Sequence, residues 1–272
     1  MIPKGVILAA GMGSRLSPIT PFVPKEMLPV CGFPAIHHAL YELVEVGVTD
    51  VMIVVSSDKT ALVSYLTEPI LPKGADAICF TAKRDELLSR LHITFAWQKT
   101  PNGTADAILL AEGFMGDDPV VVLYPDDLLS VDGSFRDGTY ATRALIHACD
   151  RYQTSAILIS EIPGASARDY GIVKIRRDGS TLRVKSLVEK PQDYREAIAY
   201  ALIGRMILTP CAVQSIRSYD RTDRQGIIPV LSAEAARGSL TAIKYDGRRY
   251  DVGSHEGYAF ALKELMKDNS RD

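Results

Sequence analysis

A glycine-rich turn and two basic residues follow the first apolar stretch of the chain, in GVILAAGMGSRLSPITPFVPKEMLPV. Gly11 and Gly13 can leave backbone amides open to phosphate oxygens. Arg15 can bind such oxygens through two nitrogens at once, and Lys25 can add a point charge a short loop later. This set of groups predicts a site for a nucleoside triphosphate.

Other interpretations of the turn differ in how well they fit the spacing. A dinucleotide-binding turn has a third glycine where this chain has Leu16, and a P-loop has a Gly-Lys-Ser/Thr sequence that does not occur here. An ordinary tight turn between a strand and a helix stays open as an alternative. The prolines on both sides of Lys25 fix its backbone and favour the phosphate site.

Two carboxylates end another apolar run, PVVVLYPDDLL. Asp126 and Asp127 follow a predicted buried strand, and hard oxygen ligands for Mg²⁺ are expected at the carboxyl edge of a parallel sheet. An ordinary Pro-Asp-Asp turn is the alternative for this pair taken alone. Asp251, in RRYDVGSHEGY, is a further acid that follows a short predicted strand. Two acids from distant segments suit Mg²⁺, because it takes few protein ligands.

Six further motifs extend these patterns into a family resemblance. In chain order they are GTADA at 103–107, YPDD at 124–127, YGIV at 170–173, VEKP at 188–191, IGRMIL at 203–208 and YDVGSHEGY at 250–258. Together with the glycine turn, they make nearly the whole chain resemble the sugar-1-phosphate nucleotidyltransferases. Within that family, PKEMLP is most similar to the bacterial UTP:glucose-1-phosphate uridylyltransferases.

The resemblance implies an activity and its cofactor. A uridylyl group passes from UTP to a hexose-1-phosphate such as glucose-1-phosphate, giving a UDP-sugar and pyrophosphate, with Mg²⁺ as cofactor. Asp126 and Asp251 are implied as the metal ligands, with Asp127 in a supporting position. Attack of the sugar phosphate on the nucleotide brings two polyanions together, so their negative charge must be neutralised. Arg15 and Lys25 are therefore expected to act as catalytic cations.

The resemblance also implies a sugar-phosphate site. Glu189 and Lys190, in SLVEKP, are expected to bind sugar hydroxyls and the sugar phosphate, with Lys190 as a further catalytic cation. Gly171 lets the backbone approach a sugar ring. A solvated charge pair before a proline is the alternative for Glu189 and Lys190.

Base recognition is assigned to Gln98, in FAWQKTPNG. Its amide offers a donor and an acceptor, which match the edge of uracil or thymine. By resemblance, Ala10 and Gly103 complete the nucleotide pocket. A polar strand end is the alternative for Gln98.

Two departures from the family pattern leave the substrates open. Ala199 stands where the uridylyl and thymidylyl branches usually carry an asparagine near the sugar, and NGTADA is closer to the segment of adenylyl and other sugar nucleotidyltransferases. A thymidylyltransferase using dTTP and glucose-1-phosphate is one alternative. A regulatory protein that binds a nucleotide-sugar without turnover is another, and the presence of both metal acids disfavours it.

Apolar runs alternate with amphipathic stretches through the first two thirds of the chain, which predicts βα units. Strands are expected within GVILAA, DVMIVVSS, ITFAW, PVVVLY, TSAILISEI and YALIGRMIL, and helices within AIHHALYELVEVG and TADAILLAEGFM. Asp178 and Gly179 predict a hairpin between residues 170 and 190. We therefore expect an α/β, Rossmann-like nucleotide-binding fold with a mainly parallel central sheet, helices on both faces and a sugar-binding β extension.

The chain is expected to form one nucleotidyltransferase domain over residues 1–272. Residues 1–130 are assigned mainly to nucleotide binding, and residues 150–255 mainly to binding of the sugar phosphate. Residues 68–90 contain two prolines, a glycine and mixed charge, which predicts a variable peripheral excursion.

Composition excludes several other classes of protein. The 31 basic and 33 acidic residues leave a net charge of -2 without a basic run, so no nucleic-acid partner is expected. No signal segment or run of 18 apolar residues occurs, which predicts no membrane partner and a cytoplasmic location. The four cysteines are too far apart for a zinc site or a disulfide framework. His37 and His38 are expected to be surface or packing residues, and a homo-oligomer stays open.

Overall fold

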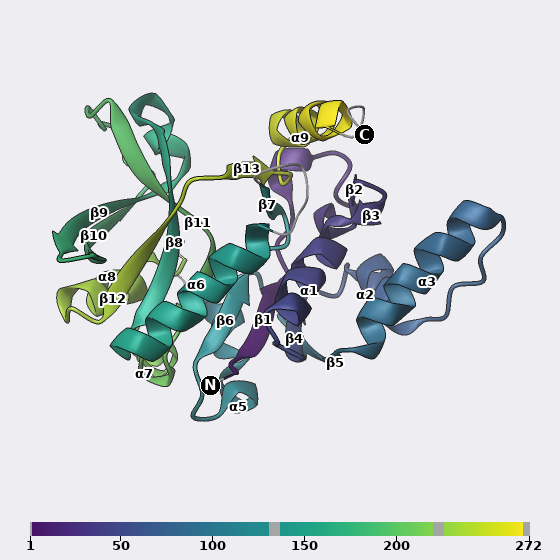
Figure 1. Cartoon of the computed structure of the whole chain (residues 1–272), viewed down its shortest axis with the longest axis horizontal. Coiled ribbons are helices and arrows are strands. Elements are labelled where there is room, and N and C mark those ends of the chain that lie inside the picture. Colours follow the sequence, from purple (N-terminus) through teal and green to yellow (C-terminus); the bar gives the residue numbers. More distant parts are fainter. Residues whose placement is uncertain (1, 131–136, 220–225, 269–272) are drawn as a thin grey trace. The chain divides into compact units, whose positions relative to one another are not determined.

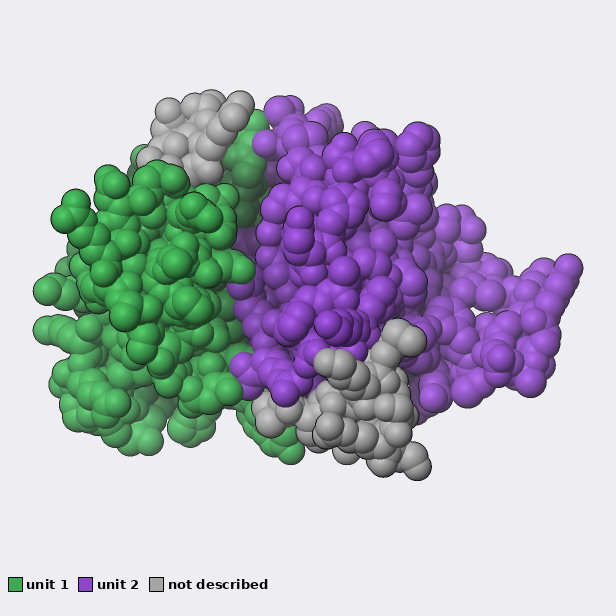
Figure 2. Space-filling model, turned by 90° about the horizontal axis from the view of Figure 1, so that it is seen from above, with its two compact units in different colours: residues 1–6, 102–123, 140–246 green, residues 7–101, 124–139, 247–272 purple. Residues whose placement is uncertain are grey.

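The structure is a computed structural model that describes residues 2–130, 137–219 and 226–268 (Figure 1). It divides into two compact units, which Figure 2 colours separately. Unit 1 contains residues 1–6, 102–123 and 140–246, and unit 2 contains residues 7–101, 124–139 and 247–272. The chain therefore passes from one unit to the other several times, and the single domain expected over 1–272 stays a prediction.

Unit 2 combines strands of a parallel sheet with two short ladders and several helices. Its elements are the end of β1 (Lys4–Leu8), β2 (Pro29–Val30), β3 (Phe33–Pro34), α1 (Ala35–Glu45), β4 (Asp50–Val55), α2 (Thr60–Thr67), α3 (Ala75–Ser89), β5 (His92–Trp97), β7 (Asp127–Ser130), β13 (Arg248–Asp251) and α9 (His255–Asp268). The strand order is β5-β4-β1. β4 and β5 are parallel, and the pairs β2–β3 and β7–β13 are antiparallel.

The local sequence explains the central elements of unit 2. β4 is apolar almost throughout, and its successive residues Ile53, Val54 and Val55 are fully buried, so both faces of the strand are covered. α1 begins after Pro34, whose fixed φ suits a helix start, and the chain leaves it at Gly47 with φ of 87°.

Unit 1 contains the larger part of the sheet. Its elements are the start of β1, α4 (Thr104–Leu109), α5 (Glu112–Met115), β6 (Val120–Leu123), most of α6 (Asp137–Tyr152), β8 (Ser155–Pro163), β9 (Gly171–Asp178), β10 (Thr181–Glu189), β11 (Ile198–Leu208), α7 (Pro210–Ser215), α8 (Ile228–Ala236) and β12 (Leu240–Tyr245). The strand order is β1-β6-β11-β8-β12-β10-β9. β12 is parallel to β8, whereas β11 is antiparallel to β6 and β8, and β10 to β12 and β9.

The structure confirms the expected strands, the helix after Pro34 and the hairpin around Gly179. Gly179 has φ of 61°, which the tight turn between β9 and β10 requires. Unit 1 contains more antiparallel strand pairs than expected for the mainly parallel sheet that the sequence predicts. The hairpin accounts for one of them, because strands joined by so short a turn pair only in opposite directions.

One expected helix differs from the structure. TADAILLAEGFM forms α4 and α5 rather than one helix, because Ala111 N bonds Ile108 O with three-residue spacing and closes α4. Residues 68–90 were expected to form a variable peripheral excursion, and most of them belong to α3, which lies at the outer edge of unit 2 (Figure 1). In the described part of the chain, every helix is too short or too polar to cross a membrane.

Arg84 ties α3 to the end of α2. Its side chain is buried, and its guanidinium donates to Tyr65 O (2.7 Å from Nε) and to Glu68 O (2.7 Å from Nη2). These carbonyls lie at the C-terminus of α2, where helix carbonyls lack partners and a cation is favoured. One buried arginine therefore holds the peripheral helix in a defined place.

Replacing Arg84 tests this attachment. Arg84→Met should lower the free energy of unfolding by about 1 to 3 kcal/mol, because it leaves buried carbonyls of α2 unpaired. Urea unfolding followed by circular dichroism measures the change, and hydrogen exchange should report faster opening of α2 and α3. Lys83→Met, at an exposed neighbour on the same helix, is the control and should be nearly neutral. Equal stability of the two variants would contradict the assignment.

Candidate active site

The glycine turn after β1 is held by hydrogen bonds on both sides. Ser56 Oγ donates to Ala10 O (3.1 Å), and Thr20 Oγ1 donates to Gly13 O (3.1 Å). Gly13 has φ of 65°, and a Cβ there would lie 2.7 Å from Thr20 Cγ2, so the position requires glycine. These contacts and the glycine requirement therefore hold the turn in one backbone conformation.

A buried ion pair supports this turn. The side chains of Lys59 and Glu26 are 1% and 0% exposed, and Lys59 Nζ lies 3.1 Å from Glu26 Oε2. Lys59 Nζ also donates to Gly11 O over 2.7 Å. Both charged groups are buried away from water, so each depends on the opposite charge of the other to offset the free-energy cost of desolvation. Sequence analysis missed both residues, because a lysine before a helix and a glutamate beside a lysine are ordinary surface patterns.

Lys25 lies between two carboxylates. Its ammonium forms a hydrogen-bonded ion pair with Asp126 Oδ2 and lies 3.9 Å from Glu26 Oε1. Burial lowers the pKa of Lys25, but the charges of Asp126 and Glu26 outweigh burial and raise it overall. Burial raises the pKa of Asp126, but the Lys25 charge and hydrogen bond outweigh it and lower that pKa overall. Lys25 is therefore cationic and Asp126 anionic at neutral pH.

Glu26 is the acid with the opposite tendency. Burial raises its pKa, and the charges of Lys25 and Lys59 only partly oppose this effect. The two lysines thus share one carboxylate that has no contact with water. This arrangement makes Glu26 part of the frame beneath Lys25 rather than a group available to a ligand.

Arg15 and Asp251 form a two-point ion pair. Arg15 Nη1 lies 2.8 Å from Asp251 Oδ2, and Nη2 lies 3.1 Å from Oδ1. The Arg15 side chain is 58% exposed, so its guanidinium also faces solvent. Gly253 N donates to Asp251 Oδ1 over 3.1 Å and fixes the carboxylate further.

Asp126 and Asp251 converge beside Gly253. A Cβ on Gly253 would overlap Asp126 Oδ2 and would lie 3.2 Å from Asp251 Oδ1, so both carboxylates border one small space. Val252 N donates to Asp126 O over 2.8 Å and joins the two segments. Such a pair fits Mg²⁺, which binds through one or two carboxylates and keeps several waters. Over the described ranges no larger cluster of His, Cys, Asp or Glu suited to a metal is present.

Asp127 faces a different partner from Asp126. Its Oδ1 accepts a hydrogen bond from Arg249 Nε over 2.6 Å, and Arg249 Nη2 lies 3.9 Å from Asp251 Oδ2. β7 and β13 place Asp127 directly opposite Asp251. Asp127 thus balances the cation next to Asp251, and its supporting position at a metal stays a prediction.

β7 and β13 are anchored by the apolar core of unit 2. The buried side chains of this cluster come from the segments before and in α1, the two strands, the residue after β13 and α9, and they are Val30, Ala35, Leu128, Tyr250, Val252, Ala261 and Leu265. The ladder is short, and its packing on α9 and α1 provides the support that a two-strand pair lacks alone. The positions of Asp127 and Asp251 therefore depend on this core.

The residues assigned to the base are divided between the units. Gln98 follows β5 in unit 2, is 7% exposed, and donates its backbone N–H to Val55 O over 2.8 Å. Ala10 lies in the glycine turn of the same unit. Gly103 precedes α4 in unit 1 and has φ of 95°. Their role in recognising the base stays a prediction.

Gly171, Glu189 and Lys190 come together in unit 1. The β9–β10 ladder pairs Gly171 with Glu189, and a Cβ on Gly171 would lie 3.2 Å from Glu189 Oε2. Lys190 has φ of 45°, and its N–H donates to Tyr170 O over 3.1 Å. Its ammonium lies 3.6 Å from Glu189 Oε1 on a side chain that is 57% exposed. A carboxylate and an accessible ammonium thus flank a glycine.

Ala199 is buried near this group. It packs in an apolar cluster with Ala167 and Ile172, against the partly buried Ile162, Tyr170 and Tyr194. A methyl group therefore fills the position where the family pattern has an amide.

His37 and His38 are packing residues, which is one of the two roles, surface or packing, that the sequence predicts for them. His37 Nδ1 lies 2.8 Å from Tyr65 Oη, and His38 Nε2 lies 2.9 Å from Val30 O. Burial lowers the pKa of His37 to about 3 and that of His38 to about 4. Both rings are neutral at physiological pH and take no part in the charged group around Lys25.

The charged group of unit 2 can bind a polyanion. Arg15 and Lys25 both follow the glycine turn in sequence. Each is held by a carboxylate that a metal ion could also engage. Preorganised cations of this kind stabilise negative charge that develops during phosphoryl or nucleotidyl transfer.

The chain belongs to the nucleotidyl transferase family, whose sequence profile matches residues 4–268. A UTP–glucose-1-phosphate uridylyltransferase of Bacillus subtilis (strain 168) is 30% identical to it over 98% of this chain and 92% of that protein. A UTP–glucose-1-phosphate uridylyltransferase of Pseudomonas aeruginosa PAO1 is 31% identical over 98% of both chains. A crystal structure of UDP-glucose pyrophosphorylase complexed with UDP-glucose has a TM-score of 0.85 and 29% identity, covering 98% of this chain and 99% of the other.

These similarities confirm the predicted family, the nucleotidyltransferase class of enzyme and the α/β Rossmann-like fold. The assignment of individual residues to substrates stays a prediction.

The Lys59–Glu26 pair generates a prediction about stability. Lys59→Met should lower the free energy of unfolding by about 3 kcal/mol, because it leaves the Glu26 charge buried without its nearest cation. Adding Glu26→Gln should recover much of this loss, since the uncompensated charge is then removed. Urea unfolding of the wild type and both variants measures the difference.

Lys99→Met, at an exposed lysine of the same unit, is the matched control and should change stability little. A double variant that is less stable than Lys59→Met alone would show that the pair is not the source of the effect.

Proposed function

We propose that the protein transfers a uridylyl group from UTP to a hexose-1-phosphate, with glucose-1-phosphate as the favoured acceptor. The products are a UDP-sugar and pyrophosphate. The observation that carries the proposal is that relatives named UTP–glucose-1-phosphate uridylyltransferase match almost the full chain at 30% identity or more. Free nucleotide and sugar phosphate are its partners, and the cytoplasm is its proposed location.

The nucleotide is assigned to unit 2. The amides of Gly11 and Gly13 and the cations of Arg15 and Lys25 are proposed to bind the triphosphate. Ordering of the turn by Thr20 and Ser56 supports this role, because the amides need no rearrangement to meet phosphate oxygens. Gln98 is proposed to pair with the base and Ala10 to bind the nucleotide through its backbone, while Gly103 of unit 1 stays a predicted nucleotide-binding residue.

The acceptor is assigned to unit 1. Lys190 is proposed to bind the phosphate of the sugar, Glu189 its hydroxyls, and Gly171 to allow close approach of the ring. The exposure of the Lys190 ammonium and its position beside Glu189 support this assignment. The side chain of Ala199 can donate no hydrogen bond to the sugar. We therefore propose that fewer protein contacts select the hexose than in the usual family pattern.

The reaction joins two anions. An oxygen of the sugar phosphate attacks the α-phosphorus of the nucleotide, and the bond from that phosphorus to the oxygen of the β-phosphate breaks, releasing pyrophosphate. Arg15 and Lys25 neutralise charge on the triphosphate and on the leaving group, while Lys190 neutralises charge on the attacking phosphate. These residues bind and orient the phosphates as cations rather than acting as bases, because a lysine ammonium and an arginine guanidinium are donors without acceptor capacity.

Nucleotidyltransferases generally use a divalent metal ion, and we propose Mg²⁺. Asp126 and Asp251 would hold it, since their oxygens border one space beside Gly253. When bound, the ion supplies Lewis-acid stabilisation of charge on phosphate oxygens.

The thymidylyl reaction is the second candidate. It rests on the chemistry of Gln98, because uracil and thymine present the same donor and acceptor to an amide.

A substrate panel tests the proposal. The protein is incubated with Mg²⁺, each of UTP, dTTP, CTP, ATP and GTP, and each of several hexose-1-phosphates, and released pyrophosphate is measured. We expect the highest kcat/KM with UTP and glucose-1-phosphate. A higher value with dTTP would make the protein a thymidylyltransferase. No release with any pair would overturn the enzymatic proposal in favour of a binding protein.

The metal acids generate a further prediction. Asp126→Asn and Asp251→Asn should each lower turnover on the order of 100-fold, because the site loses an anionic ligand with little change in volume. Pyrophosphate release gives the rate, and calorimetric titration with Mn²⁺ as a probe gives the metal affinity, which should also fall.

Asp127→Asn is the matched control, because Asp127 is paired with Arg249 rather than directed to the shared space. It should keep most turnover and Mn²⁺ affinity once its folded fraction is checked by circular dichroism. Wild-type Mn²⁺ affinity in Asp126→Asn or Asp251→Asn would remove that acid from the metal site.

A further inference from the structure

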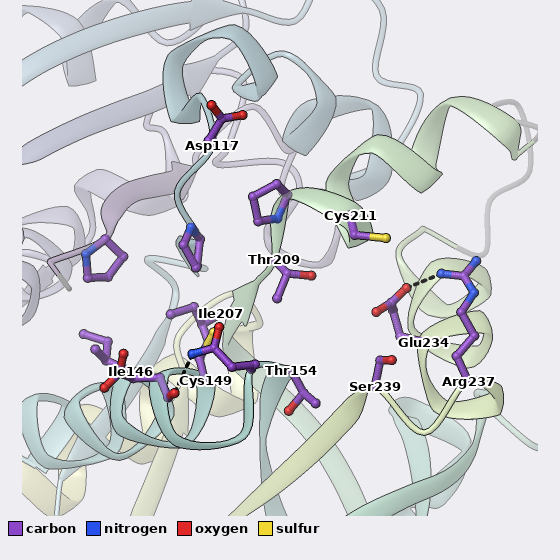
Figure 3. Close-up of a pocket in the computed structure, with 15 residues that line it drawn as sticks. Asp117, Ile146, Cys149, Thr154, Ile207, Thr209, Cys211, Glu234, Arg237 and Ser239 are labelled. Carbon is purple, nitrogen blue, oxygen red and sulfur yellow. Dashed lines mark hydrogen bonds and ion pairs between the residues drawn. The ribbon is translucent and has the colours of Figure 1, made fainter.

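A cavity of about 440 Å³ lies within unit 1, at the edge of the sheet where several strands begin or end (Figure 3). Its wall includes Pro119 before β6, Thr154 before β8, Ser239 before β12 and Thr209 after β11. The helices α6, α7 and α8 contribute the remaining sides. This volume is within the range of sites that bind small molecules.

The cavity and the residues assigned to the sugar lie at opposite ends of β8. The cavity meets this strand at its start, before Ser155. At the other end, Ile162 pairs with Ala199, which packs on Ile172 next to Gly171. At a rise of about 3.3 Å per residue, the two ends are on the order of 20 Å apart. The cavity is therefore separate from the sugar residues of unit 1.

One wall of the cavity is apolar. Ile146 and Cys149 of α6 and Ile207 of β11 line it. Burial, with a contribution from the charge of Asp150, raises the pKa of the Cys149 thiol to about 11, so the thiol is neutral at physiological pH. This wall suits the hydrocarbon or aromatic body of a ligand.

The opposite wall carries a buried carboxylate. The Glu234 side chain is 2% exposed and accepts a hydrogen bond from Arg237 Nη1 over 2.5 Å, while the Arg237 side chain is 49% exposed (Figure 3). Among the described residues, Arg237 is the one side chain that bonds this carboxylate. Burial raises the pKa of Glu234 and Arg237 opposes the rise. A carboxylate with further acceptor capacity thus borders the cavity.

The charge of the lining favours a cation. Asp117, Asp150 and Glu234 are acidic, and Arg237 is the one basic residue among the lining side chains, all of which the structure describes. An anionic ligand would meet this excess of carboxylates, whereas an ammonium group would reduce it.

We propose that this cavity binds a small molecule with an apolar, aromatic-sized body and a primary amine, whose ammonium group donates to the Glu234 carboxylate. The body packs on Ile146 and Ile207. The Glu234 carboxylate is buried, but its partner, the Arg237 guanidinium, is half exposed. The ammonium of the ligand would give this carboxylate a second cationic donor. No step of the proposed nucleotidyl transfer uses these residues, so the inference goes beyond that function.

Three probes of one shape test the proposal on the full chain. 1-Naphthylmethylamine, 1-naphthalenemethanol and 1-naphthoic acid share an aromatic body and differ in charge. Calorimetric titration should show one amine bound per chain, about tenfold tighter than the alcohol, because a hydrogen bond to a charged group exceeds a neutral one. The acid should bind more weakly than the alcohol.

Variants locate the binding. Glu234→Gln should abolish the preference for the amine while leaving the affinity for the alcohol unchanged, and Ile146→Trp should fill the cavity and weaken all the probes. Glu161→Gln, at a partly exposed carboxylate paired with Lys244 outside the cavity lining, is the matched control and should keep the preference.

Several outcomes would overturn the proposal. These are equal affinity for the amine and the acid, an amine preference that survives Glu234→Gln, or binding that survives Ile146→Trp. A dimer seen by sedimentation velocity that Ile146→Trp dissociates would instead assign the cavity to a second copy of the chain.

Discussion

The balance of buried charge around Lys25 is the constraint on which unit 2 depends. Lys25 is held by Asp126 and Glu26, and Glu26 in turn is held by Lys59. These groups have little contact with water, so loss of one would leave another charged and unpaired. Because the pairs join the loop before α1, the start of α2 and the end of the segment after β6, they also determine where those elements meet. Lys59 extends the frame to the glycine turn through Gly11 O.

The same pairing prepares the site for a polyanion. A long cationic side chain in water loses conformational freedom when it binds phosphate, and a side chain already held by a carboxylate has lost much of it on folding. Lys25 is mostly buried and belongs to the rigid part of the site, whereas Arg15 is more than half exposed and can adjust to its ligand. Under the proposed assignment, a metal ion at Asp126 and Asp251 would engage the carboxylates that hold these two cations. Binding of the metal would then be coupled by charge to binding of the triphosphate.

Much of the fold and of the site could be predicted from local patterns. β1, β4, β5, β6, β8 and β11 are continuous or nearly continuous apolar runs, and the hairpin after Gly171 has its turn at a glycine, so short windows of sequence suffice for them. Lys59 and α3 could not be predicted in this way. SSDKTALV is a typical exposed helix start, and EPILPKGADAICF contains the prolines and glycine of a loop. The bonds from Arg84 that attach α3 to the end of α2 are tertiary contacts, which neither segment shows by itself.

The sequence by itself determined the chemistry: a glycine turn, cations and carboxylates in a family order that predicted nucleotidyl transfer, because each motif carries its residue types at short and recognisable spacing. Tertiary structure alone decided how those charges are paired. Asp126 and Asp127 are neighbours with the same side chain, but the β7–β13 ladder turns Asp127 to Arg249 and leaves Asp126 with Lys25. Which charge faces which depends on segments more than a hundred residues apart, and no local pattern contains that distance information.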